Sequence, residues 1–113
     1  MPHLIVEISD GLTEAIEPES ILYVLHDAAL ASGQFNEADI KVRIRPYDHA
    51  FVAGSAADFI HVTVLLISGR DTETKQALCR RLLSALEGLG LKAASISVDA
   101  RDLDRDIYVK QTR

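Results

Sequence analysis

Pro2 is the position at which this sequence could carry an unusual base. Removal of Met1, which is usual when a small residue follows, would leave a secondary amine at the start of the chain. A free α-amino group has a pKa of about 7.7–8.0, and burial or neighbouring cations lower that pKa. Such an amine can act as a general base near neutral pH. The alternative is that Pro2 simply follows the initiator methionine and has no chemical role.

Arg70 lies between the strongest predicted strand of the chain and a predicted helix. A guanidinium in such a turn can hold a carboxylate, or it can stabilise an oxygen that gains negative charge during a reaction. The alternative is a surface arginine that pairs with the neighbouring Asp71 or Glu73.

Lys41, Arg43 and Arg45 alternate with apolar residues between positions 40 and 46. Because successive side chains of a strand point to opposite faces, the three cations share one face and form a basic stripe. The stripe could bind the carboxylates of an anionic ligand. Alternatively, it is a solvated face or an edge strand whose charges discourage aggregation.

Charge is divided unevenly along the 113 residues. Residues 1–40 contain eight acids and no Lys or Arg, whereas residues 41–113 contain all 12 basic residues and nine acids. An acidic chain without a basic tail is a poor nucleic-acid binder, because neutralising phosphates supplies most of that affinity. An anionic ligand must therefore be met by a local cluster from the second part of the chain.

Cysteine and histidine usage also limits the possible functions. Cys79 is the single cysteine, which excludes an internal disulfide, and the four histidines lack the spacing of metal ligands. We therefore expect no metal. No apolar run approaches the ~20 residues of a membrane span, and no secretory signal is visible. These features predict a cytoplasmic protein that does not associate with membranes.

The hydrophobic pattern predicts four strands and two helices that could position these residues. Ser9–Gly11 is expected to break the chain after the first strand, and residues 47–55 to form turns around a short hairpin arm. Ser68 and Asp71 have the spacing of a capping box before the second helix. Residues 106–110 could add a short final strand. The predicted strands are 2–8, 40–46, 59–67 and 94–98, and the predicted helices run from Pro18 to Gly33 and from Asp71 to Gly88.

The order of these elements is β-α-β followed by a second β-α-β. We predict one domain, residues 1–113, made of two pseudo-repeats, 1–57 and 58–113, each with a parallel strand pair and a right-handed crossover. The expected fold class is α+β, with a four-stranded mixed sheet and both helices on one face. The uncovered face should be largely apolar, because the third strand has Val and Ile in both alternating sets, and we therefore expect a homo-oligomer.

Two stretches resemble the 5-carboxymethyl-2-hydroxymuconate isomerases of the tautomerase superfamily. They are Pro2–Asp10 (PHLIVEISD) and His61–Gln76 (HVTVLLISGRDTETKQ). The second stretch is also similar to the strand-Gly-Arg-helix segment of 4-oxalocrotonate tautomerase. The resemblance extends over most of the chain and is weakest at residues 47–58.

The resemblance implies a homotrimer and a cofactor-free isomerase with Pro2 and Arg70 as catalytic residues. Lys41 and Arg43 would bind the carboxylates of an unsaturated 2-hydroxy or 2-oxo dicarboxylic acid, such as 5-carboxymethyl-2-hydroxymuconate from aromatic-compound breakdown. Lys41 stands where the family has an arginine, and a lysine cannot form the bidentate fork of a guanidinium. Two alternatives are a phenylpyruvate-type tautomerase and a non-catalytic binding module like macrophage migration inhibitory factor.

Overall fold

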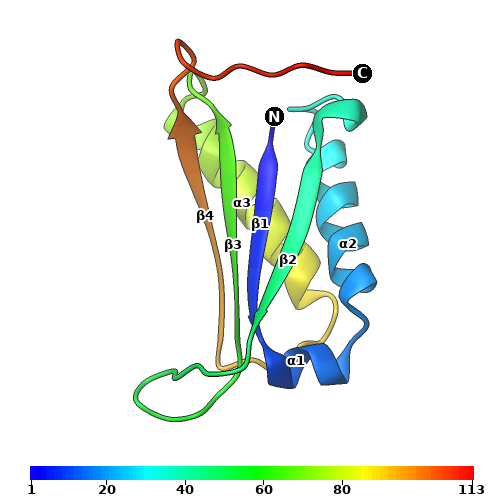
Figure 1. Ribbon diagram of the computed structural model, residues 1–113, viewed down its shortest axis with the longest axis vertical. Helices are drawn as coiled ribbons and strands as arrows, with labels where there is room; N and C mark the ends of the chain where they lie inside the picture. Colours follow the sequence, from blue (N-terminus) through cyan, green and yellow to red (C-terminus); the bar gives the residue numbers. More distant parts are fainter.

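The computed structural model describes residues 1–113 as one four-stranded sheet with helices on one face (Figure 1). This arrangement confirms the predicted α+β class. The strands are β1 (His3–Ser9), β2 (Lys41–Tyr47), β3 (Phe59–Ile67) and β4 (Ser95–Leu103). The helices are α1 (Asp10–Ala15), α2 (Pro18–Ala31) and α3 (Thr72–Glu87), with a short 3-10 turn, η1 (Glu37–Asp39). None of the helices is both long and apolar enough to cross a membrane.

The strand order β2-β1-β3-β4 explains which parts of the chain meet. Strands β1 and β2 are parallel, β3 and β4 are parallel, and β1 pairs with β3 in the antiparallel direction. The starts of β1 and β2 therefore lie beside the ends of β3 and β4, at the top of Figure 1. We call this edge the N-terminal end of the sheet. Helix α2 ends there and helix α3 begins there, so two connections and both chain termini lie at the same end of the sheet.

The core lies between the sheet and helices α2 and α3. Alternate residues of β1 and β3 point to the helices and are fully buried, and leucines from α3 close the layer. Burial of these apolar side chains is the main stabilising contribution to the fold. The 14 residues of this core are Leu4, Val6, Ile8, Leu12, Ile21, Leu25, Ala29, Ile60, Val62, Val64, Leu66, Leu78, Leu82 and Leu86.

The uncovered face of the sheet differs from the prediction of a largely apolar surface. Polar and charged side chains occupy much of it, because the strict alternation of β1 and β3 places most branched residues on the helix side. On this face, His61 Nδ1 and Ser97 Oγ lie 2.7 Å apart on neighbouring strands. The exposed large apolar side chains all lie outside the sheet; they are Tyr23, Leu30, Phe51, Ile107 and Val109. The uncovered face is therefore less apolar than the sequence predicts.

Helix α1 replaces the break predicted at Ser9–Gly11. The Ser9 hydroxyl donates to Asp58 Oδ1 at 2.9 Å, so a loop residue distant in sequence fixes the start of this helix. Gly11 is required for that approach, because a Cβ at this position would lie 2.4 Å from Asp58 Oδ1. The contact of Ser9 and Gly11 with Asp58 joins residues distant in sequence, so the local sequence around Gly11 could not predict it.

Three other local predictions need correction. Asp71 alone caps α3 by accepting the Thr74 N–H at 2.8 Å, whereas the predicted capping box began at Ser68. The hairpin arm is reduced to one isolated bridge between Val52 and Ser55. Residues 106–110 form no strand, and β4 instead continues beyond the predicted 94–98 to Leu103.

Candidate active site

The N-terminal end of the sheet brings Pro2, Lys41 and Arg70 into one region. Pro2 is buried directly before β1, and its carbonyl accepts the backbone N–H of Lys41, the first residue of β2, at 3.1 Å. Arg70 lies in the turn between the end of β3 and the start of α3. Parallel pairing of β1 with β2 and antiparallel pairing with β3 together account for this convergence.

The Arg70 guanidinium is held by three protein acceptors. Its Nε donates to Gln34 Oε1 at 3.0 Å, Nη2 to the Gln34 carbonyl at 3.1 Å, and Nη1 to the Ile67 carbonyl at 3.2 Å. The guanidinium carbon also lies 5.0 Å from the centre of the Phe35 ring, within the range of a cation–π contact. A guanidinium has five N–H donors, so two of them have no protein acceptor and can meet a ligand.

The observed contacts of Arg70 differ from the pairing with Asp71 or Glu73 that was considered as an alternative. Its hydrogen bonds go to Gln34 and Ile67, and it forms no salt bridge with Asp71 or Glu73. The half-buried arginine is therefore a rigidly placed cation at the N-terminal end of the sheet.

Gln34, which the sequence analysis did not single out, fixes the orientation of Arg70. It follows Gly33, whose positive φ of 75° turns the chain at the end of α2. Gly33 is the predicted helix stop, and this glycine is the one signal in the sequence that a loop begins here. The sequence around Gln34 does not indicate that this residue contacts Arg70, 36 positions away.

Asp39 holds two lysines at the start of β2. Its backbone carbonyl accepts Lys41 Nζ at 2.8 Å, and its carboxylate Oδ1 accepts Lys110 Nζ at 2.7 Å. The hydrogen bond between Lys110 and Asp39 lowers the pKa of Asp39 and raises the pKa of Lys110. The sequence analysis named Lys41 but neither Asp39 nor Lys110, which are 71 residues apart and share no motif.

The amine at the start of the chain lies in this cationic surrounding. Burial is the largest effect that lowers the pKa of the Met1 amine, followed by the charges of Lys110 and Lys41. The Asp39 carboxylate opposes the shift, and Arg70 adds a smaller lowering. A base at this position therefore has a larger unprotonated fraction at neutral pH than an ordinary amine.

Arg43 lies further along β2, on the uncovered face of the sheet. Its Nη1 is 3.0 Å from His3 Nδ1, and since a guanidinium can only donate, the His3 proton must be on Nε2. That nitrogen then donates to the Tyr108 hydroxyl at 3.2 Å. Burial, followed by the charges of Arg43 and Lys41, lowers the pKa of His3, in agreement with a neutral ring. The hydrogen bond of Arg43 is thus to His3, next to the Pro2 region.

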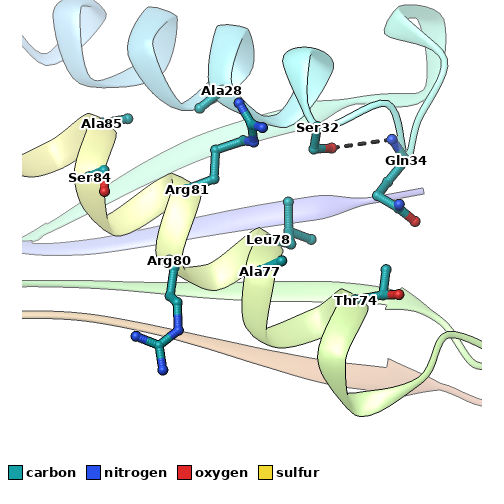
Figure 2. A pocket seen from close by; sticks show the side chains of 10 residues that line it. All are labelled: Ala28, Ser32, Gln34, Thr74, Ala77, Leu78, Arg80, Arg81, Ser84 and Ala85. Atoms are coloured by element: carbon teal, nitrogen blue, oxygen red, sulfur yellow. Dashed lines mark hydrogen bonds between the residues drawn. The ribbon is translucent and has the colours of Figure 1, made fainter.

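A separate hollow of about 670 Å³ lies between helices α2 and α3 and contains none of the predicted site residues. Figure 2 shows small side chains along it, with Arg81 reaching toward α2 and Arg80 pointing the other way. Gln34, which accepts a hydrogen bond from Arg70, also lines this hollow. The structure gathers no group of three or more His, Cys, Asp or Glu side chains that could hold a metal ion.

Comparison with known proteins identifies the family. Residues 2–111 match the family of 5-carboxymethyl-2-hydroxymuconate isomerases. The chain belongs to this family. The resemblance predicted from two short stretches is therefore confirmed over nearly the whole sequence.

Individual relatives agree with this assignment. The 5-carboxymethyl-2-hydroxymuconate Delta-isomerase of Escherichia coli is 31% identical over 78 residues, which are 67% of this chain and 62% of that protein. The chain thus matches less than two thirds of this relative's length. A fused 4-OT symmetric trimer is 32% identical, with a TM-score of 0.78 over 91% of this chain and 86% of that one.

A solved 5-carboxymethyl-2-hydroxymuconate isomerase from Deinococcus radiodurans R1 has the same fold as this family member. Its TM-score is 0.83 at 23% identity, over 99% of this chain and 90% of that one.

Proposed function

We propose that this chain is a cofactor-independent isomerase that moves a proton and a double bond in an unsaturated 2-hydroxy or 2-oxo dicarboxylic acid. The substrate expected from the family is 5-carboxymethyl-2-hydroxymuconate. One observation carries the proposal: the buried Pro2 lies at the same end of the sheet as Lys41 and a rigidly held Arg70. Isomerisation of this kind needs a base near neutrality and cations that stabilise an anionic intermediate.

Pro2 is the base of the proposed reaction. Removal of Met1 moves the free amine one residue deeper, onto a buried proline whose ring fixes its orientation. The neutral nitrogen takes a proton from the substrate, and the electrons of the broken bond pass into a conjugated dienolate. The protonated Pro2 then returns the proton to a different carbon, so that the double bond moves and the base is regenerated.

The cations stabilise the charge that this step creates. The two free N–H groups of Arg70 bind a carboxylate oxygen or the dienolate oxygen, and the contacts with Gln34 hold these donors in place. Lys41 supplies a second, point-like charge. Arg43, through its position beside His3, would contact only a more distant part of a ligand.

We extend the proposal to a homotrimer. The likeness to a fused 4-OT symmetric trimer at 32% identity supports this assembly. The uncovered sheet face would then lie toward the other subunits. Its polar and charged residues would require polar partners or water there, unlike the apolar contact expected from the sequence.

The proposal is tested by the ultraviolet absorbance of a 2-hydroxymuconate dienol, with protein shown by intact mass to lack Met1. Pro2→Ala replaces the rigid secondary amine by a flexible primary amine and is expected to lower kcat/KM about 10²-fold, the lower end of the usual contribution of a positioned base. Pro46→Ala, at an exposed proline in β2, is the matched control and should behave like the wild type.

The same assay separates the alternatives. Turnover of the enol of phenylpyruvate, with the dicarboxylate left unconverted, would support a phenylpyruvate-type tautomerase. Equal rates for wild type and Pro2→Ala would remove Pro2 as the base. A protein that converts neither compound would support the non-catalytic binding module.

A further inference from the structure

The C-terminal segment, residues 104–113, crosses the N-terminal end of the sheet (Figure 1). After β4 ends at Leu103, backbone N–H groups of Ile107 and Tyr108 donate to the Asp104 carbonyl at 3.2 and 3.1 Å. This turn sends the chain past the start of β1 toward β2, in the opposite part of the sheet. The segment therefore passes over the region that contains Pro2.

Three contacts fix the C-terminal segment to different elements. Arg105 Nη2 and Nε donate to the Ser68 carbonyl at 2.6 and 3.2 Å, after the end of β3. Tyr108 contacts His3 of β1, and Lys110 contacts Asp39 of η1. The segment is thus tied down on both sides of Pro2.

Side chains of this segment point alternately toward the molecule and away from it. Tyr108 is half-buried and the Lys110 side chain is 31% exposed, whereas Ile107 and Val109 are 75% and 89% exposed. An extended chain directs every second side chain to the same side. The segment therefore directs its phenol and its ammonium toward the N-terminal end of the sheet.

Lys110 belongs to the cationic surrounding of the amine. Among the charges that lower the pKa of the Met1 amine, that of Lys110 is the largest. Asp39 is its only hydrogen-bond partner, and an ammonium has three donors, so two remain for a ligand. Since Asp39 also accepts Lys41 Nζ, one residue holds both ammonium groups at this site.

We propose that Lys110 is a substrate-binding residue that receives the carboxylate farthest from the reacting end of the substrate. This proposal rests on the proposed function and names the part of the site that selects dicarboxylates over monocarboxylates. Arg70 serves the end of the substrate at which charge develops, whereas Lys110, on the C-terminal segment, is held by Asp39 beside Lys41 at the start of β2. The expected ligand is a dianion long enough to extend from Arg70 to Lys110.

The test compares Lys110→Met with the control Lys92→Met, which changes an exposed lysine of the loop after α3. KM and kcat are measured for 2-hydroxymuconate and for the enol of phenylpyruvate. Lys110→Met should raise KM for the dicarboxylate about tenfold, the loss of one charge-assisted contact, and change KM for the monocarboxylate less than twofold. Lys110→Arg should restore the preference, and Lys92→Met should leave both substrates unaffected.

Equal losses on both substrates, or no loss on either, would overturn the proposal for Lys110. A binding measurement tests the role of Lys110 if no turnover is found. Calorimetric titration with adipate and hexanoate reports the same preference without a reaction, and Lys110→Met should weaken adipate binding only. If Pro2→Ala retains wild-type turnover while Lys110→Met alters the preference, the proposed base is wrong but the carboxylate site remains. Unchanged adipate binding in Lys110→Met would overturn the site itself.

Discussion

Arg70→Lys is the substitution that most directly tests how this site is built. Lysine keeps the positive charge but has three donors in place of five and no planar fork. Three guanidinium N–H groups of Arg70 already bind Gln34 and Ile67, which leaves two for substrate. A lysine ammonium cannot serve these three acceptors and a substrate carboxylate at the same time. The variant should therefore fold normally but lose transition-state stabilisation.

The size of that loss follows from the hydrogen bonds involved. A hydrogen bond to a charged group contributes about 1.5–3 kcal/mol, and removal of one donor to a developing oxyanion costs about 2.7–4 kcal/mol. Loss of one or two substrate contacts at Arg70 should thus raise the barrier by about 2–4 kcal/mol, which lowers kcat/KM by about 30- to 1000-fold. Because the charge itself is retained, the effect should be larger on kcat than on KM.

The measurement is the initial rate of dienol disappearance in the ultraviolet, with circular dichroism as the check on folding. Arg80→Lys is the matched control, since Arg80 is an exposed arginine on α3 that makes no side-chain hydrogen bond. A folded Arg70→Lys variant with more than a third of wild-type kcat/KM would show that the fixed guanidinium has no catalytic role. The assignment of Arg70 would then be wrong, whatever the effect of Pro2→Ala.

Leu82→Ala, in the fully buried core, should lower the free energy of unfolding in urea by about 2–5 kcal/mol, whereas Leu30→Ala at a partly exposed site should change it by less than about 1 kcal/mol. Gly69→Ala should cost about 1–3 kcal/mol, because φ at this residue is 129° and the new Cβ would lie 3.0 Å from Arg105 Nη2; an unchanged midpoint would contradict this. Burial and the charge of Lys110 lower the pKa of the Met1 amine, and the Pro2 amine would lie next to that position. The acid limb of kcat/KM should therefore have its midpoint below the ordinary pKa of an amine, and Lys110→Met should move that midpoint to higher pH.

The strands and helices that form the core could be predicted from the sequence because their hydrophobic patterns and helix-start signals are local. Strict alternation in β3 and the Pro18 start of α2 specify a strand and a helix without reference to the rest of the chain. Doubling of the β-α-β order then predicts the parallel pairs that the structure shows. Helix α1 was missed because Gly11 reads as a turn residue, and only the contact with Asp58 shows why glycine is needed there.

The prediction of a final strand at residues 106–110 was wrong for a different reason. Residues 106–110 alternate like a strand, and Tyr108 and Lys110 do point to one side. A strand also needs a neighbour with free backbone groups, and the turn at Asp104 directs the chain away from the sheet edge. Local alternation predicted the direction of the side chains but not the absence of pairing.

Only part of the candidate site was accessible to sequence analysis. Pro2, Lys41 and Arg70 were singled out by residue type, their roles in a site were implied by the family resemblance, and the topology brings them to one end of the sheet. Gln34 and Lys110 act through contacts across 36 and 71 residues, which no spacing rule anticipates. Two of the three acceptors of Arg70 are backbone carbonyls, and these are present at every residue and have no sequence signature.

Asp39 connects the acidic first part of the sequence with the basic residues of the second part. This aspartate is the last acid of the purely acidic first 40 residues, and Lys41, two positions later, is the first basic residue of the chain. The fold brings Lys110 to the same point, where Asp39 accepts both ammonium groups. Cations near an amine base attract an anionic substrate but also lower the pKa of the base, and a base that is too weak removes protons poorly. Asp39 opposes that lowering while it holds the lysines in place, so in the proposed site it would allow attraction for carboxylates to be combined with an effective base.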